Sequence, residues 1–280
     1  MLAIIDPGDE VIIPDPGYPT YGSVTAMVGA TPVMVPLREE NGFRMNPEDV
    51  RKQITDRTKL IVLNSPHNPT GSVMTASEIA EIYEIAQEHD LYVISDEVYG
   101  KMTYDNVENV SITTHDKALE HSILLDGFSK CYVMTGWRLG YVVAPVKMAQ
   151  RLQDFLVSAV SCTASFTQWA GVAALTGDQS FIPEMMSRFN EKRERIIKGL
   201  NAIPDFSCQM PKGAFYAFPN ITGTGMSSQQ CSEMILKQGH IATVPGTAFG
   251  ANGEGFIRFS YATSLEIIDE AMAKLQKIFK

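Results

Sequence analysis

Short, continuous apolar runs dominate the first 145 residues of the chain. Six of them, at residues 10–14, 31–35, 59–64, 91–95, 122–125 and 139–144, alternate with helix-like stretches. A strand that is apolar along its whole length is covered on both faces, as in a parallel sheet flanked by helices. Between the third and fourth runs, Ile79, Ile82, Ile85 and Ala86 recur at helical spacing. The pattern predicts an α/β fold with a mostly parallel sheet.

The remainder of the chain has a different pattern. A proline-free stretch at 148–175 predicts a long helix or a helix pair, and a helix is predicted at 181–200. Short strands and helices then alternate, with strands at 213–218 and 255–260 and helices near 227–238 and 265–278. We therefore predict two domains. A large α/β domain with its connecting helix covers 1–175, and a smaller α+β domain covers 176–280.

The composition argues against several classes of function. The 280 residues carry a net charge of −9, which gives no general attraction to nucleic acid or to an anionic membrane surface. The apolar run 1–5 meets Asp6 too early to form a signal peptide or a membrane span. The four cysteines are far apart, and the five histidines show no ligand spacing. We expect reduced thiols, a cytoplasmic protein and no metal site.

One lysine and one arginine stand out after the fifth apolar run. Lys130 follows that run closely, and Arg138 comes eight residues later. A lysine at the end of a buried strand is partly desolvated, which lowers its pKa and makes it a nucleophile toward carbonyl carbon. Arginine offers a planar, charged fork for a phosphate. Together they indicate a site for pyridoxal 5′-phosphate (PLP). A solvated loop lysine and a surface arginine are the alternative.

Other polar and aromatic side chains follow the ends of the predicted strands, where ligands bind in open α/β sheets. Asp96 can pair with the pyridine nitrogen of PLP, while Tyr99 and Asn68 can donate to its phenolate oxygen. Tyr18 can stack on the ring, and Arg258 can hold a substrate carboxylate. Individually, Asp96 could be a helix cap, Tyr18 a core residue and Arg258 a solvent-facing arginine.

Taken in order, these motifs resemble the class I and II PLP-dependent aminotransferases of fold type I, the aspartate aminotransferase superfamily. The matching segments cover almost the whole chain and lie at residues 16–19, 64–71, 95–99, 127–140, 211–216, 245–249 and 258–262. The resemblance implies a mostly parallel large domain and a smaller C-terminal α+β domain. It implies a ping-pong transfer of an amino group between an α-amino acid and a 2-oxo acid, in a homodimer.

The resemblance also assigns roles to residues. Lys130 would form the internal aldimine and move the proton, and Asp96 would pair with the pyridine nitrogen. Tyr99 and Asn68 would contact the phenolate oxygen. Ser129 and Arg138 would lie beside the phosphate, and Arg258 would hold the substrate carboxylate. Asn68 is expected to bind the substrate as well. Many relatives carry a phosphate-binding serine where this chain has Gly127, so one such contact is expected to be absent.

Relatives begin well before this chain does, with a glycine-rich phosphate-binding turn and an N-terminal arm. We therefore expect a truncated or partial chain that holds most of its site. Two alternatives stay open. One is a PLP-dependent C–S β-lyase, for which His67 gives slight support. The other is a non-catalytic binding module of aminotransferase type. The identity of the substrate amino acid stays open as well.

Overall fold

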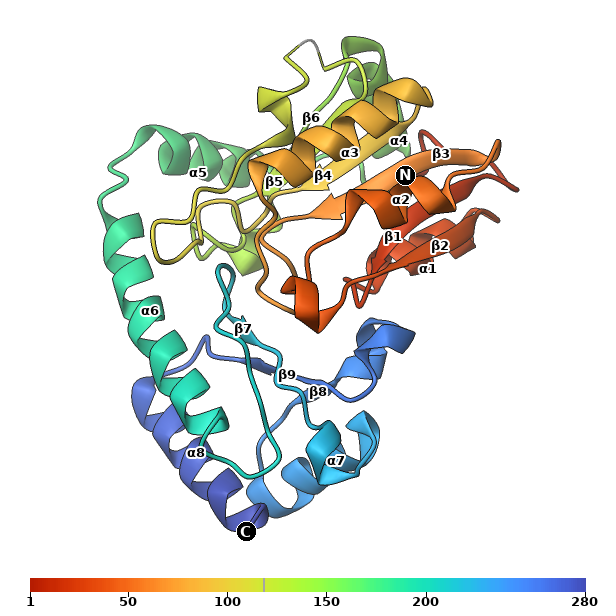
Figure 1. Ribbon diagram of the computed structural model, residues 1–280. Coiled ribbons are helices and arrows are strands. Elements are labelled where there is room, and N and C mark those ends of the chain that lie inside the picture. Colours follow the sequence, from red (N-terminus) through yellow and green to blue (C-terminus); the bar gives the residue numbers. More distant parts are fainter. Residues whose placement is uncertain (118) are drawn as a thin grey trace.

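A six-stranded sheet forms the N-terminal half of the protein in the computed structural model, which describes residues 1–117 and 119–280. The strand order is β2-β1-β3-β4-β5-β6. The first five strands are parallel, and β6 runs antiparallel to β5 (Figure 1). The strands are β1 Glu10–Asp15, β2 Thr31–Pro36, β3 Thr58–Asn64, β4 Tyr92–Asp96, β5 Ser122–Gly127 and β6 Gly140–Val143. All six predicted strands, and the mostly parallel sheet, are confirmed.

Both faces of this sheet carry a hydrophobic core, which explains why the strands are apolar throughout. Along β3, Ile61 and Leu63 belong to one core cluster, whereas Leu60 and Val62 belong to the other. The first cluster includes residues of α2 (Pro47–Gln53) and α3 (Ala76–Glu88), and the second includes residues of α1 (Thr20–Met27) and α4 (Val146–Val160). Helices on both faces expose the carboxyl ends of the strands at one edge.

The long predicted helical stretches are confirmed. Residues 148–175 form a pair, α4 and α5 (Ser165–Thr176), and α6 covers Phe181–Leu200 as predicted. Helix α6 leads from the six-stranded sheet to the C-terminal part, where it packs against α8 (Leu265–Ile278) (Figure 1). The short helices α1 and α2 were not predicted individually, because α1 contains a glycine and little apolar periodicity and α2 has seven residues.

The C-terminal part holds a three-stranded antiparallel sheet in the order β7-β9-β8. Its strands are β7 Tyr216–Ala217, β8 Val244–Pro245 and β9 Ile257–Ser260, with α7 at Ser228–Met234 and a π-helical turn at Ile235–Gly239. The strand predicted at 213–218 is too long. The backbone N–H of Gly213 donates to Gly71, and that of Ala214 donates to Met102, so these residues pair with loops of the larger sheet instead of with a strand.

Within the described residues, the helices are too short or too polar to span a membrane.

Candidate active site

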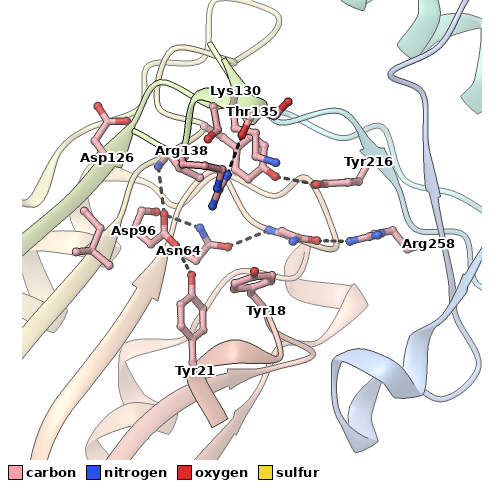
Figure 2. A pocket seen from close by; sticks show the side chains of 15 residues that line it. Tyr18, Tyr21, Asn64, Asp96, Asp126, Lys130, Thr135, Arg138, Tyr216 and Arg258 are labelled. Carbon is pink, nitrogen blue, oxygen red and sulfur yellow. Dashed lines mark hydrogen bonds between the residues drawn. The ribbon is translucent and has the colours of Figure 1, made fainter. Parts of the chain in front are cut away.

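A cavity of about 520 Å³ opens at the carboxyl ends of β1, β3, β4 and β5, between the large sheet and the C-terminal sheet. Strands β2 and β3 lie on opposite sides of β1, so the cavity sits where the strand order reverses, the usual ligand position in this architecture. Figure 2 shows its side chains converging from these elements. It is lined by Tyr18, Tyr21, Asn64, Asn68, Asp96, Val98, Tyr99, Leu125, Asp126, Ser129, Lys130, Thr135, Arg138, Tyr216 and Arg258.

All eight residues singled out from the sequence line this one cavity, although they come from segments far apart in the chain. They are Tyr18, Asn68, Asp96, Tyr99, Ser129, Lys130, Arg138 and Arg258. The structure therefore brings the predicted residues together, and their individual roles stay predictions.

Lys130 lies just beyond β5 and is partly buried. Its Nζ atom is 5.5 Å from the ring centre of Tyr99 and 5.6 Å from that of Phe215. Burial lowers the pKa of Lys130, and the positive charges of Arg258 and Arg138 lower it further, while Asp96 opposes them. A lysine in this environment has a larger fraction of neutral, nucleophilic amine than a solvated one.

Asp96 ends β4 and is held by two hydrogen bonds. The hydroxyl of Tyr21 donates to its Oδ2 atom at 2.6 Å, and the backbone N–H of Val98 donates to Oδ1 at 3.2 Å. Burial raises the pKa of this carboxyl group, whereas the two hydrogen bonds lower it by stabilising the anion. Tyr21 was missed from the sequence because its helix, α1, was not recognised. Its position three residues after Tyr18 is the signal that could have identified it.

Tyr99 points toward the cavity from the turn after β4, and it is paired with a residue of the C-terminal sheet. Its hydroxyl is 2.7 Å from that of Tyr216, and both side chains are buried. Burial raises the pKa of Tyr99, so the phenol stays protonated at neutral pH. Tyr216 was not among the predicted site residues, although it ends the predicted segment 211–216.

Arg258 reaches the cavity from β9 and touches the loop after β3. Its Nη1 atom donates to Oδ1 of Asn68 at 2.9 Å, and the backbone N–H of Asn68 donates to Oδ1 of Asn64 at 3.0 Å. Among the described residues, the buried Nε atom of Arg258 has no hydrogen-bond partner. The guanidinium thus has unused donors for an anion, and the amide group of Asn68 keeps its Nδ2 donors.

Three more lining residues, Ser129, Thr135 and Arg138, come from the segment that follows β5. Arg138 is exposed, and its Nη1 atom donates to the Thr135 carbonyl at 2.8 Å. Asp126 also lines the cavity, and its carboxylate accepts from the Gly127 N–H and from the Tyr141 hydroxyl, both at 2.6 Å. The Ser129 hydroxyl and the Arg138 guanidinium are suitable donors for a phosphate.

The donor set of this cavity fits PLP. It offers an amine for an aldehyde, a carboxylate for a pyridine nitrogen, a phenol for a ring oxygen, and a guanidinium with a hydroxyl for a phosphate. The residues in those positions would be Lys130, Asp96, Tyr99, and Arg138 with Ser129. The exposed ring of Tyr18 stands at the same cavity and can cover a flat ligand.

Comparison with known proteins agrees with this chemistry. The model of the family "Aminotransferase class I and II" matches residues 1–275. The chain is 42% identical to an aspartate aminotransferase of Pyrococcus abyssi and 39% identical to aromatic-amino-acid aminotransferase 2 of Thermococcus litoralis. Each alignment covers 100% of this chain and 72% of the relative.

Solved structures show the same fold. An aromatic aminotransferase from Pyrococcus horikoshii superposes with a TM-score of 0.95 at 41% identity, covering 99% of this chain and 74% of that one. An aspartate aminotransferase from Thermus thermophilus, solved with maleate, has a TM-score of 0.94 at 34% identity, covering 99% and 71%. These relatives favour neither the β-lyase nor the binding module. The chain therefore belongs to the class I and II aminotransferases, PLP-dependent enzymes of fold type I that move an amino group between an amino acid and a 2-oxo acid.

Proposed function

We propose that Lys130 is the catalytic lysine of this aminotransferase and that Asp96, Tyr99 and Arg138 hold its cofactor. The observation that supports this most is their convergence, with Arg258, on one cavity. When bound, PLP supplies an aldehyde that accepts the amino group and a ring that withdraws electrons from the substrate carbon. In the first half of the ping-pong cycle, the Lys130 amine would take the proton from the substrate Cα and deliver it to the cofactor carbon that carried the aldehyde. In the second half it would move a proton in the opposite direction, onto the Cα of the new amino acid.

The other residues orient and stabilise the reactants. The Asp96 carboxylate, kept anionic by Tyr21, favours a protonated pyridine nitrogen. Ser129 and Arg138 anchor the phosphate end, while Tyr18 covers the ring face. Arg258 binds the α-carboxylate through its unused donors, and Asn68 fixes its orientation.

Reduction with borohydride tests the role of Lys130. We expect the reduced wild-type enzyme to carry the cofactor on the peptide that contains Lys130, as read by proteolysis and mass spectrometry. Lys130→Ala should not carry that label, and its amino-transfer rate should be about 10²–10⁴-fold lower than that of wild type. Lys101→Ala is the matched control, because Lys101 is exposed and its Nζ atom bonds Tyr132 outside the cavity. Labelling that persists in Lys130→Ala would refute the assignment.

We propose that the amino donor is acidic or aromatic. The relatives reported above are named for aspartate and for aromatic amino acids, and one was solved with the dicarboxylate maleate. A panel of aspartate, tyrosine, phenylalanine and alanine, each with 2-oxoglutarate, tests this. Activity with alanine alone would contradict the proposal. Pyruvate released from a β-substituted amino acid without an acceptor would instead reveal lyase activity.

We propose that the enzyme is a homodimer joined through the face formed by β6, α4 and α5. This face exposes large apolar side chains, among them Val160, Phe166 and Trp169 with 67%, 70% and 74% exposed. Contiguous exposed apolar surface of this kind marks interaction sites. A groove on it is lined by Trp137 and by Arg138, which also lines the active-site cavity. A second copy seated there would adjoin the phosphate end of the site.

Sedimentation of the purified protein tests the dimer. Wild-type protein should sediment as a dimer, and Trp169→Glu should shift it toward monomer because a charge would be buried in the interface. Ile267→Glu is the control, since Ile267 is similarly exposed but lies on α8. A wild-type monomer at high concentration would refute the proposal.

We keep the division into domains 1–175 and 176–280, and the cytoplasmic location, as proposals. The six-stranded sheet lies before the gap between α5 and α6, and the three-stranded sheet lies after it. Limited proteolysis that cuts first near residues 177–180 would support this boundary. All four cysteines are free, as is usual in a reducing compartment. Cell fractionation would test the location.

A further inference from the structure

Tyr216 is a buried phenol of the candidate active site that is not among the residues proposed to hold the cofactor or the substrate. It lies on β7, and its hydroxyl is 2.7 Å from that of Tyr99, which is 117 positions away in the sequence. The side chains of Tyr216 and Tyr99 are only 6% and 3% exposed. In Figure 2, Tyr216 approaches the cavity from the same side as Arg258, opposite Asp96.

The register of the small sheet explains why Tyr216 and Arg258 are neighbours. β7 pairs antiparallel with β9, and Tyr216 faces Ser260. Arg258 precedes Ser260 by two residues, so its side chain projects from the same face as Tyr216. The guanidinium carbon of Arg258 lies 4.6 Å from the ring centre of Tyr216. Tyr216 therefore contacts both the group proposed to bind the α-carboxylate and the phenol proposed to bind the cofactor.

The direction of the hydrogen bond between the two phenols decides what Tyr99 can do, because each hydroxyl has one proton. Tyr99 has no proton left for a ligand when it donates to Tyr216. When Tyr216 donates instead, the Tyr99 proton is free to point into the cavity. Burial raises the pKa of both groups, so both phenols are protonated at neutral pH.

The charges around the pair favour Tyr216 as the donor. The Arg258 cation lies over the Tyr216 ring and stabilises negative charge on the Tyr216 oxygen, which makes this hydroxyl more acidic and a stronger hydrogen-bond donor. Tyr99 lies three residues after Asp96, whose negative charge raises the pKa of Tyr99 more than Arg258 lowers it, so the Tyr99 oxygen is the better acceptor. The Tyr216 hydroxyl then donates its proton to the Tyr99 oxygen, and the Tyr99 hydroxyl points its own proton into the cavity.

We propose that Tyr216 is a positioning residue of this aminotransferase: its hydroxyl donates to Tyr99 and thereby turns the Tyr99 proton toward the ring oxygen of the bound cofactor. The inference rests on the proposed role of Tyr99. Hydrogen bonds in a chain strengthen one another by roughly 10–30%. A second donor behind Tyr99 therefore stabilises negative charge on the ring oxygen more than Tyr99 does alone.

The test is a pH titration of the visible absorption of the cofactor-loaded enzyme without substrate. Tyr99→Phe removes the donor to the ring oxygen, so the negative charge there is less stable and the pKa of the bound chromophore should rise. Tyr216→Phe should raise the same pKa by a smaller amount, about 0.3 pH units. Because the ring oxygen is then less well stabilised, kcat should fall. Because Tyr216→Phe keeps the ring over Arg258, KM for the amino acid should stay within about twofold.

Each outcome distinguishes the inference from the proposed function. In the Tyr99→Phe background, Tyr216→Phe should no longer change the chromophore pKa. A fall of that pKa in Tyr216→Phe would mean that Tyr216 competes for the Tyr99 proton, and no change would mean that it is not coupled; either result overturns the inference alone. No effect of Tyr99→Phe would overturn both the role of Tyr99 and the inference.

Tyr104→Phe is the matched control. Tyr104 is another buried tyrosine in a phenol–phenol hydrogen bond, at 3.2 Å from the Tyr261 hydroxyl, but it does not line the cavity. Its substitution should leave the chromophore pKa unchanged. An equal shift in Tyr104→Phe would show that the effect of Tyr216→Phe is structural, which overturns the inference.

Discussion

Removal of the Tyr21 hydroxyl should destabilise the cofactor-free protein in a pH-dependent way. The Tyr21 hydroxyl donates to the Asp96 carboxylate at 2.6 Å, and both groups are removed from most of the solvent. Tyr21→Phe keeps the ring but deletes the donor. A hydrogen bond to a charged group contributes about 1.5–3 kcal/mol, so we expect the free energy of unfolding to fall by about 2 kcal/mol near neutral pH.

The sign of the pH dependence follows from the raised pKa of Asp96. Folding raises the pKa of Asp96, so the ionised carboxylate lowers the free energy of unfolding at pH values above its folded-state pKa. This penalty disappears as the pH falls and Asp96 becomes protonated in both states. Tyr21 offsets part of the penalty. Once Asp96 is neutral, the hydrogen bond contributes only about 1 kcal/mol. The stability deficit of Tyr21→Phe, which is its loss in free energy of unfolding relative to wild type, should therefore be about half as large in acid.

Urea unfolding followed by circular dichroism measures this deficit at neutral and at acidic pH, with an unchanged m value as the check on two-state behaviour. The same comparison in an Asp96→Asn background isolates the pair. The deficit should be about half as large there, since the amide is neutral. A deficit that is equal at both pH values and equal in both backgrounds would refute the reasoning.

Three further predictions concern the substrate arginine, an ion pair and a turn. Arg258→Lys keeps the charge but loses the fork, so KM for the amino acid should rise about 10- to 100-fold in steady-state assays, while a smaller change would argue against a bidentate contact. Asp105→Ala leaves the Arg193 guanidinium, only 3% exposed, without its 2.7 Å partner and should lower the free energy of unfolding by about 2 kcal/mol. Since the ion pair lowers the pKa of Asp105, its contribution is present above about pH 4 and is lost as pH falls further, as acid titration of stability would show. Gly71 has a φ of +71°, and a Cβ atom added there would lie 2.5 Å from Pro211. Gly71→Ala should therefore lower the free energy of unfolding, measured in urea, by at least about 2 kcal/mol, and a variant as stable as wild type would contradict this.

Much of the fold could be predicted because its signals are local. Strands covered on both faces are continuously apolar, and α3 and α6 are long enough for clear helical periodicity. The small sheet could not be delimited in the same way. The backbone of Gly213 and Ala214 bonds to Gly71 and Met102, in loops more than a hundred residues earlier, and no local pattern records such a partner.

The same distinction applies to the site. The sequence by itself determined the residues at the strand ends, including Asp96 and Lys130, because a polar residue that follows a buried run must lie at the sheet edge. Only the tertiary structure decided the pairs that join those ends to other elements: Tyr21 with Asp96, Tyr99 with Tyr216, and Asn68 with Arg258. These partners are 75, 117 and 190 positions apart. Their contacts depend on how the helices and the small sheet pack against the large sheet, which no periodicity or motif in one segment can specify.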